Sequence, residues 1–259
     1  MRALHDQHFL CDDDAVKKIS EFTDVKGVKV LEIGPGRGVL TKALLDRGAE
    51  VTAIELDGTL IPCLEIFFKK EIESGRLKII HGDAAKCVLP EFDKVVANLP
   101  YSVSSKITFR LLGKKFSEAV LMYQKEFAER MIALPGTADC GRLSVMVQTY
   151  AKVMPLLELK PGSFSPPPEV DSWVVRITPK KELTYQIDDK EFYSDLVREL
   201  FSLRRKTIRK ALKISSKKLG EKNVERIFEN IPEELLQKRP EELTLKEFSF
   251  MSNIAKIAK

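Results

Sequence analysis

The stretch that decides the fold reads VKVLEIGPGRGV and runs from Val28 to Val39. Its first half is a short run rich in β-branched residues, which is typical of a parallel strand buried on both faces. Its second half, from Gly34 to Gly38, is a glycine-rich turn at which the backbone can approach a ligand closely. The helix expected after this turn begins with unpaired N–H groups that favour an anionic or polar ligand. The same pattern also fits a tight turn in any α/β protein, so it does not identify a ligand by itself.

Similar apolar runs recur along the first half of the chain, and helix-like segments separate them. The further runs that predict strands are Val51–Glu55, Leu77–His81, Lys94–Ala97 and Ala119–Tyr123. The segments between or after them that predict helices are Leu40–Arg47, Leu60–Glu73, Ser104–Leu112 and Gln124–Ile132. This alternation indicates right-handed βαβ crossovers and a doubly wound, mostly parallel sheet.

The pattern changes in the second half of the chain. After a helical stretch at 142–150, two apolar runs at 153–159 and 172–177 flank a turn with three consecutive prolines, which predicts an antiparallel hairpin at the sheet edge. Beyond Lys181 only amphipathic helices are indicated, for example Phe192–Leu203 and Val224–Asn230. We therefore expect an α/β domain over residues 1–180 and a small all-helical domain over residues 181–259.

Composition excludes several classes of protein. Hydrophobic residues make up 44% of the 259 residues and charged residues 31%, which is ordinary for a globular chain and unlike a disordered tail or a coiled coil. There is no run of eighteen apolar residues, and the acidic start lacks the apolar core of a secretory signal. The four cysteines are scattered without a CxxC pair. We expect a cytoplasmic protein with reduced thiols, no membrane span and no metal site.

Two acidic residues follow predicted strands on the side of the glycine turn. Glu55 ends the second strand, 21 positions after Gly34, where a carboxylate can accept both hydroxyls of a ribose. Asp83 follows the third strand and could accept the amine of an adenine. Both NAD and S-adenosylmethionine (SAM) contain such an adenosine. A dinucleotide site usually has a third glycine at the position of Val39, so the spacing favours SAM.

The fourth predicted strand ends in Asn98-Leu99-Pro100-Tyr101. The exocyclic nitrogen of adenine is a poor nucleophile because its lone pair is delocalised into the ring. Two acceptors that hold its two N–H bonds, here the Asn98 side chain and the Pro100 backbone carbonyl, would favour a pyramidal nitrogen with an exposed lone pair. Tyr101 offers a face on which the base can stack. Positioning and electrostatics would then suffice for methylation of this nitrogen, and no metal ion would be needed. The alternative is a structural Asn-Pro turn beside a buried tyrosine.

Basic residues are concentrated near the start of the helical region. The net charge is +5, and the segment from Arg204 to Lys218 holds eight basic residues and no acidic one. Such a cluster is either a solvated helix face or a contact for a polyphosphate such as RNA.

Taken together, these motifs resemble the KsgA/Dim family of ribosomal RNA adenine dimethyltransferases, which are class I SAM-dependent methyltransferases. The resemblance covers almost the whole chain, and the compact length looks more like an archaeal member than a bacterial one. It rests on Gln7-His8-Phe9-Leu10, Leu31–Gly38, Glu55, Gly82-Asp83-Ala84, Asn98–Tyr101, Phe164–Ser172, Phe201–Thr207 and Arg239–Leu243.

The resemblance implies the transfer of two methyl groups to the N6 of each of two adjacent adenosines, in the hairpin loop near the 3′ end of small-subunit rRNA. It implies a Rossmann-like sheet and a pre-30S ribosomal particle as substrate. Nothing in the sequence points away from a monomer, which is the state we expect. Many family members have Asn at the position of His8. By the resemblance and the glycine-turn pattern, the residues expected to bind SAM are His8, Leu10, Gly34, Gly36, Glu55, Asp83 and Asn98.

A target base must leave its stack to reach such a pocket. Phe164 is the candidate for the second face of the base, opposite Tyr101, although it could also be a hydrophobic plug beneath the proline-rich turn. The residues expected to contact the RNA backbone are Arg204, Arg205, Lys206, Arg209 and Lys210.

Three other functions stay open at this point. A DNA N6-adenine methyltransferase shares the chemistry, but Leu99 stands where NPPY-type enzymes of that class have a proline, and the helical C-terminal region also argues against it. A ribosome-assembly factor whose methylation is secondary would use the same RNA contacts. An NAD oxidoreductase fits the glycine spacing poorly.

Overall fold

The computed structural model describes residues 7–256 and divides the chain into two compact units. The first unit runs up to Ala128 and includes Lys152–Pro179, and the second contains Glu129–Ala151 and the chain from Lys180 onward. Its last junction lies within a residue or two of the boundary predicted at 180/181. The division differs in residues 129–151, which group with the C-terminal helices because the helix at 142–150 packs on the helix at 190–202.

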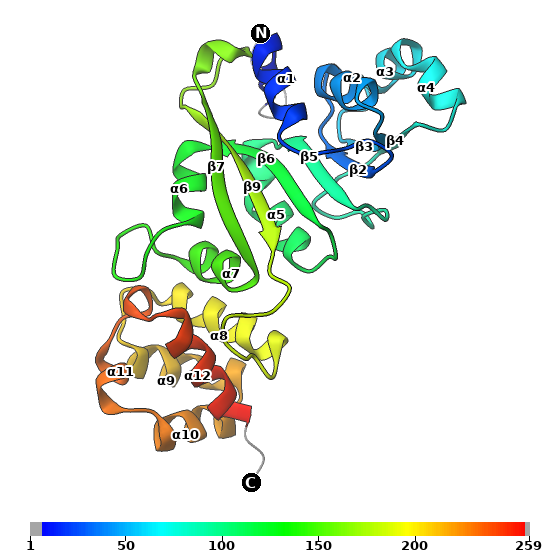
Figure 1. The fold of residues 1–259 in the computed structure, drawn as a ribbon. Coiled ribbons are helices and arrows are strands. Elements are labelled where there is room, and N and C mark those ends of the chain that lie inside the picture. Colours follow the sequence, from blue (N-terminus) through cyan, green and yellow to red (C-terminus); the bar gives the residue numbers. More distant parts are fainter. Residues whose placement is uncertain (1–6, 257–259) are drawn as a thin grey trace. The chain divides into compact units, whose positions relative to one another are not determined.

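The first unit is built on a seven-stranded sheet with the order β4-β3-β2-β5-β6-β9-β7 (Figure 1). The strands β2 to β6 pair in parallel, and β9 runs antiparallel to β6, with Leu121 opposite Val175. The predicted mostly parallel sheet with an antiparallel terminal hairpin is therefore confirmed. The strands are β2 Lys29–Ile33, β3 Glu50–Glu55, β4 Leu77–His81, β5 Lys94–Asn98, β6 Glu118–Gln124, β7 Ala151–Leu159 and β9 Ser172–Pro179.

Both faces of the central strands are covered, as their non-alternating sequences predict, whereas the edge strands β4 and β7 are only partly buried. Val95 and Val96 of β5 point to opposite faces, and both are fully buried. The predicted helix at 60–73 is instead two short helices, because the chain leaves helical geometry at Phe68, whose buried ring packs beneath Gly38. The helices of this part are α1 Asp13–Glu21, α2 Val39–Asp46, α3 Ile61–Phe67, α4 Lys69–Glu73, α5 Ser104–Leu112 and α6 Lys125–Met131, with a 3-10 turn η1 at Tyr101–Val103.

A second, two-stranded sheet joins the N-terminal segment to the proline-rich turn. Strand β1, Phe9–Leu10, pairs antiparallel with β8, Phe164–Ser165, and the Cys11 N–H donates to the Ser163 carbonyl at 2.9 Å. A 3-10 turn, η2 Pro161–Ser163, precedes β8. Strands of two residues carry no periodic pattern, so the sequence did not predict this pairing. It holds the N-terminal segment against the proline-rich turn.

The second unit is helical, as predicted. Its core is formed by buried apolar residues on facing helices, including Leu196, Leu212 and Phe248. Side-chain caps fix two helix starts: Asp189 accepts from the Phe192 N–H at 2.8 Å, and Thr207 caps the next helix. The helices are α7 Arg142–Tyr150, α8 Lys190–Ser202, α9 Ile208–Leu219, α10 Glu221–Asn230, α11 Glu233–Gln237 and α12 Leu245–Lys256, with a 3-10 turn η3 at Pro240–Glu242. Within residues 7–256, no helix combines the length and apolar character that crossing a membrane requires.

Candidate active site

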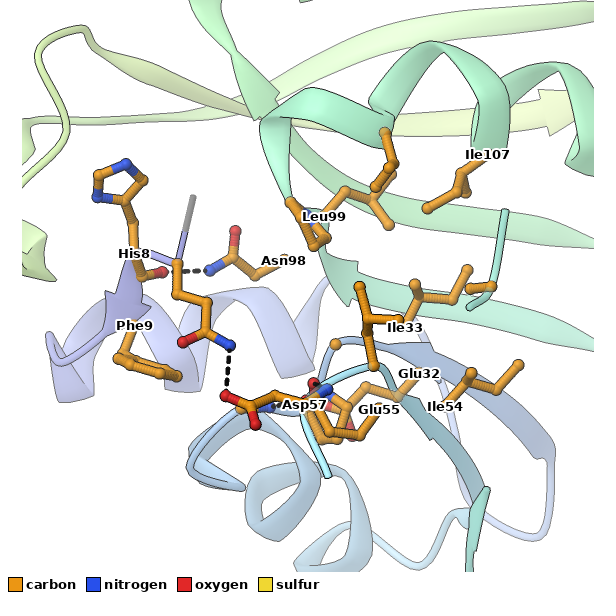
Figure 2. A pocket seen from close by; sticks show the side chains of 18 of the residues that line it. His8, Phe9, Glu32, Ile33, Ile54, Glu55, Asp57, Asn98, Leu99 and Ile107 are labelled. Carbon is orange, nitrogen blue, oxygen red and sulfur yellow. Dashed lines mark hydrogen bonds between the residues drawn. The ribbon is translucent and has the colours of Figure 1, made fainter. Parts of the chain in front are cut away.

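A cavity of about 320 Å³ opens at the carboxyl ends of strands β2, β3, β4 and β5 (Figure 2). Open α/β sheets bind their ligands at this edge. The lining residues come from the N-terminal segment, the glycine turn, the ends of the strands and the start of α5. Those that carry the argument below are His8, Phe9, Leu10, Glu32, Gly34, Gly36, Glu55, Asp83, Asn98, Leu99, Pro100, Tyr101, Val103 and Ile107.

The glycine turn and the loop after β5 lie side by side. Gly34 and Gly36 have φ angles of 70° and 57°, which favour glycine over other residues. A Cβ on Gly36 would stand 2.8 Å from the Phe9 ring, and a Cβ on Gly34 would stand 3.8 Å from the Asn98 carbonyl oxygen. The glycine turn and the Asn98 loop therefore contribute to the same cavity. This arrangement is required if a methyl group is to pass from a cofactor at the glycine turn to a base at the Asn98 loop.

Glu55 is held in a fixed orientation at the end of β3. Its carboxylate is almost fully buried and accepts hydrogen bonds from the Gly36 N–H at 3.1 Å and the Asp57 N–H at 2.8 Å (Figure 2). Each oxygen thus uses one lone pair on the backbone and keeps another for a ligand. The side chain lies where the ribose of an adenosine is expected.

Asp83 follows β4 in a compact turn. Its Oδ1 accepts from the Ala85 N–H at 2.8 Å, and Oδ2 lies 3.2 Å from the Lys86 ammonium. The backbone hydrogen bond from Ala85, followed by the Lys86 contact, lowers the pKa of this carboxyl. The group therefore stays ionised at neutral pH and can accept an adenine amine.

Glu32 is a site residue that the sequence interpretation missed. It lies within β2, lines the cavity, and is fully buried with its carboxyl accepting from the Thr41 hydroxyl at 2.7 Å. Burial raises its pKa to about 8, against the opposing effect of the Thr41 hydrogen bond. The available signal was an acidic residue in the part of the strand that is otherwise apolar, Val30–Ile33, two residues before the glycine turn.

We expect Glu32→Gln to flatten the pH dependence of folding stability. Because the folded pKa is raised, the folded state binds more protons than the unfolded chain, and the stabilisation is present below pH 4.5 and lost as the pH rises toward 8. At 1.36 kcal/mol per pKa unit, the wild type should lose up to about 5 kcal/mol relative to the variant over this interval. Urea unfolding at pH 5 and pH 8.5 measures the difference. Parallel profiles would contradict it, and Glu50→Gln, on the exposed start of β3, is the control.

The Asn98 side chain is oriented by the N-terminal segment. Its Nδ2 donates to the His8 carbonyl at 3.1 Å, so its Oδ1 is the atom left for a substrate donor (Figure 2). The Pro100 carbonyl, in contrast, accepts from the Val103 N–H and the Ser104 hydroxyl, both at 3.2 Å. A carbonyl with two partners is poorly suited to the acceptor role predicted for Pro100.

Tyr101 and His8 both line the cavity and contact each other. Their ring centroids are 5.4 Å apart with a 30° tilt, and the Tyr101 hydroxyl is 2.7 Å from Ser172 Oγ. The His8 Nδ1 is 2.9 Å from the Pro166 carbonyl. The His8 ring thus lies on the acceptor side of the cavity, beside the tyrosine. Its expected contact with SAM stays a prediction.

Leu10 and Phe164 face each other in the small sheet and are both buried. Leu10 also lines the cavity, whereas Phe164 is 3% exposed and packs in the main hydrophobic core rather than in the cavity lining. This position matches the hydrophobic plug considered above. Stacking of Phe164 on a base would require it to leave the core, so we do not place it in the mechanism below.

The predicted RNA-contacting residues fall into two groups. Arg204 donates to the Ala138 carbonyl at 2.5 Å and lies 3.8 Å from Glu241, and Arg209 forms an ion pair with Glu233, so both have partners within their own unit. The other three predicted residues have exposed side chains: Arg205, Lys206 and Lys210. The sequence could not separate these groups, because it shows charges but not their partners.

Comparison with known proteins identifies the family. The family model described as "Ribosomal RNA adenine dimethylase" matches residues 1–253. The chain belongs to this family. A "Probable ribosomal RNA small subunit methyltransferase A" from Methanospirillum hungatei is 52% identical over 253 residues, which are 98% of each chain. A protein of the same description from Methanococcoides burtonii is 41% identical over 250 residues, and both organisms are archaea, as expected.

Two solved transferase structures have the same fold over nearly the whole chain. A dimethyladenosine transferase from Plasmodium falciparum is 32% identical, with a TM-score of 0.78 over 94% of this chain and 96% of that one. The 23S rRNA methyltransferase ErmE is 25% identical, with a TM-score of 0.64 over 95% and 99%. The chain is thus a SAM-dependent rRNA adenine dimethyltransferase, and neither the DNA methyltransferase nor the NAD oxidoreductase is favoured. In residues 7–256, no cluster of His, Cys, Asp and Glu has the arrangement of a metal site.

Proposed function

We propose that this rRNA adenine dimethylase transfers two methyl groups to the N6 of each of two adjacent adenosines, in the 3′-terminal hairpin loop of small-subunit rRNA. Its substrate would be an assembling small subunit, a pre-30S particle, in the cytoplasm, and the enzyme would act as a monomer. The observation that carries the proposal is one cavity that joins the Glu55 and Asp83 side to the Asn98–Tyr101 loop.

The cofactor side of the cavity suits the adenosine of SAM. We propose that Glu55 accepts the ribose hydroxyls, that Asp83 accepts the adenine amine, and that the close approach allowed at Gly34 and Gly36 places the backbone against the rest of the molecule. The cavity volume of about 320 Å³ lies in the usual range for small-molecule sites. When bound, SAM supplies an electrophilic methyl group on a sulfonium.

The acceptor side holds the target nitrogen. We propose that Asn98 Oδ1 accepts one N–H of the adenine amine and that the Leu99 backbone carbonyl, rather than that of Pro100, accepts the other. This change follows from the two hydrogen bonds that the Pro100 carbonyl already accepts. Held in this way, the nitrogen would present its lone pair to the methyl carbon. The N–C bond would form as the C–S bond breaks, S-adenosylhomocysteine would leave as the neutral thioether, and the surplus proton on nitrogen would pass to water. Tyr101 would hold one face of the base.

A methylation assay tests this assignment. The protein is incubated with labelled SAM and one of three substrates: archaeal small subunits that lack the modification, the naked rRNA, or duplex DNA. We expect label in adenines of the small subunit, with at most a trace in duplex DNA. Label in duplex DNA at a comparable rate would favour the DNA methyltransferase. Rescue of subunit assembly by a catalytically inactive variant would instead favour an assembly factor whose methylation is secondary.

We further propose that RNA contacts an exposed basic face of the second unit, defined here as Arg205, Lys206, Lys210, Lys213 and Lys217. Lys210, Lys213 and Lys217 recur at helical spacing along α9, opposite the buried Ile208, Ala211, Leu212, Ser215 and Leu219. The face adds Lys213 and Lys217 to the predicted set. It leaves out Arg204 and Arg209, whose partners are internal.

Neutralising this face should weaken binding and reduce its salt dependence. The triple variant Lys206→Gln, Lys210→Gln, Lys213→Gln is expected to lower the slope of log affinity for small subunits against log salt by about two to three, with SAM affinity unchanged. Filter binding at several salt concentrations measures the slope. The matched control neutralises Lys69, Lys70 and Lys78, exposed on the first unit. An unchanged slope in the first variant, or an equal change in the control, would refute the assignment.

A further inference from the structure

Arg110 on α5 connects the two sides of the cavity, and none of the roles assigned above uses it. Its guanidinium donates to two backbone carbonyls of the turn after β4: Nη1 to Ala84 at 2.6 Å and Nη2 to Cys87 at 2.5 Å. A planar guanidinium can hold two acceptors at once in a fixed geometry. Among the residues that the structure describes, Arg110 has no ion-pair partner, so its contacts with this turn are the ones that define its position.

The turn that Arg110 holds is the one that presents Asp83. The N–H groups of Lys86 and Cys87 both donate to the Asp83 carbonyl at 2.8 Å, and the Ala85 N–H donates to its side chain. Residues 83–87 therefore form one small hydrogen-bonded unit. Arg110 donates to the carbonyls of Ala84 and Cys87, which are the second and last residues of this unit. A shift of the arginine would therefore shift the Asp83 carboxylate.

The helix that carries Arg110 begins at the acceptor loop. Helix α5 starts three residues after Tyr101, and Val103, Ile107 and Arg110 follow at spacings of four and three, which place them on one helix face. Val103 and Ile107 line the cavity, and Ile107 is 1% exposed. The arginine thus extends the wall of the acceptor side to the turn on the cofactor side.

We propose that Arg110 is a positioning residue that holds the Asp83 turn in place for the adenine of SAM. The inference rests on the proposed role of Asp83 in binding that adenine. Arg110 acts through geometry, because the cations that lower the pKa of Asp83 are Lys86 and Lys106. Its loss should therefore weaken SAM binding without changing the charge state of the carboxylate.

Steady-state kinetics of Arg110→Met test the proposal. We expect KM for SAM to rise about tenfold, with kcat and KM for the small subunit within about twofold of wild type. Arg110→Lys can reach one of the two carbonyls, so its KM for SAM should lie between those of the wild type and Arg110→Met. This variant replaces Arg110→Met in the test if the methionine variant does not fold. Arg76→Met is the matched control, since Arg76 also donates to a backbone carbonyl, that of Leu45, but lies outside the cavity lining.

Asp83→Asn separates this inference from the function on which it rests. If Arg110 acts through Asp83, the Asp83→Asn, Arg110→Met double variant should have nearly the KM for SAM of Asp83→Asn alone. An unchanged KM in Asp83→Asn would overturn the role of Asp83, and the inference with it. A raised KM in Asp83→Asn with an unchanged KM in Arg110→Met would overturn the inference alone. Equal rises for SAM and the small subunit, or a rise equal to that of Arg76→Met, would show a merely structural role and also overturn it.

Discussion

Replacing Asn98 with alanine is expected to lower kcat by about 100- to 1000-fold, the usual cost of removing one group that stabilises a transition state. The amide oxygen is lost from the position where the target nitrogen donates, so the lone pair stays delocalised in the adenine ring. The same change removes the hydrogen bond to the His8 carbonyl. Single-turnover methylation of small subunits at saturating SAM measures the chemical step directly.

Two comparisons make this result specific to Asn98. SAM affinity of Asn98→Ala, measured by calorimetry, should change far less than kcat, since the cofactor side of the cavity is built mainly from other residues. Asn230→Ala is the matched control, because Asn230 also donates its Nδ2 to a backbone carbonyl, that of Arg226, but in the second unit. Near-normal turnover of Asn98→Ala would remove the proposed mechanism.

Replacing Glu55 with alanine is expected to raise the dissociation constant for SAM by about 100-fold. The carboxylate should hold both ribose hydroxyls, and hydrogen bonds to a charged group contribute about 1.5–3 kcal/mol each. The substitution also leaves the N–H groups of Gly36 and Asp57 without their acceptor, which loosens the glycine turn. Calorimetric titration with SAM or S-adenosylhomocysteine measures the loss.

The matched control for Glu55 lies in the same strand. Glu50 starts β3 and is exposed, so Glu50→Ala removes an equal charge without touching the cavity. We expect its SAM affinity to remain within about twofold of wild type. A dissociation constant of Glu55→Ala within threefold of wild type would show that the ribose is bound elsewhere.

The strands that position the site could be predicted because a strand that is buried on both faces has a recognisable, mostly apolar sequence. The central parallel strands β2, β3 and β5 are covered on both faces and largely apolar without alternation, and they end at the glycine turn, Glu55 and Asn98. The strand that leads to Asp83, β4, lies at the sheet edge and is only partly buried. Because the carboxyl ends of parallel strands share one edge of the sheet, the sequence was enough to predict that these groups lie close together. The close approach of Gly34 to the Asn98 loop agrees with that expectation.

Other features depend on partners that a sequence does not show. The two-residue pairing of β1 with β8, which buries Phe164, has no periodic signal of its own. The unsuitability of the Pro100 carbonyl as an acceptor depends on hydrogen bonds made within its own turn. The basic segment also looked uniform until Arg204 and Arg209 proved to have internal partners. In each case the sequence shows the type of residue, but not the neighbouring groups that decide what the residue can do.

The central claim is that the loop after β5 holds the exocyclic nitrogen of an adenine next to the SAM cavity. The most direct measurement is a crystal structure with a bisubstrate inhibitor, in which the N6 of a target adenosine is linked covalently to a SAM analogue that keeps both its own adenosine and its methionine part. The account predicts that the linked nitrogen lies within about 3 Å of Asn98 Oδ1, with the target adenine against Tyr101 and the cofactor adenosine between Glu55 and Asp83. A target adenine bound away from Asn98, with the cofactor half in place, would contradict it.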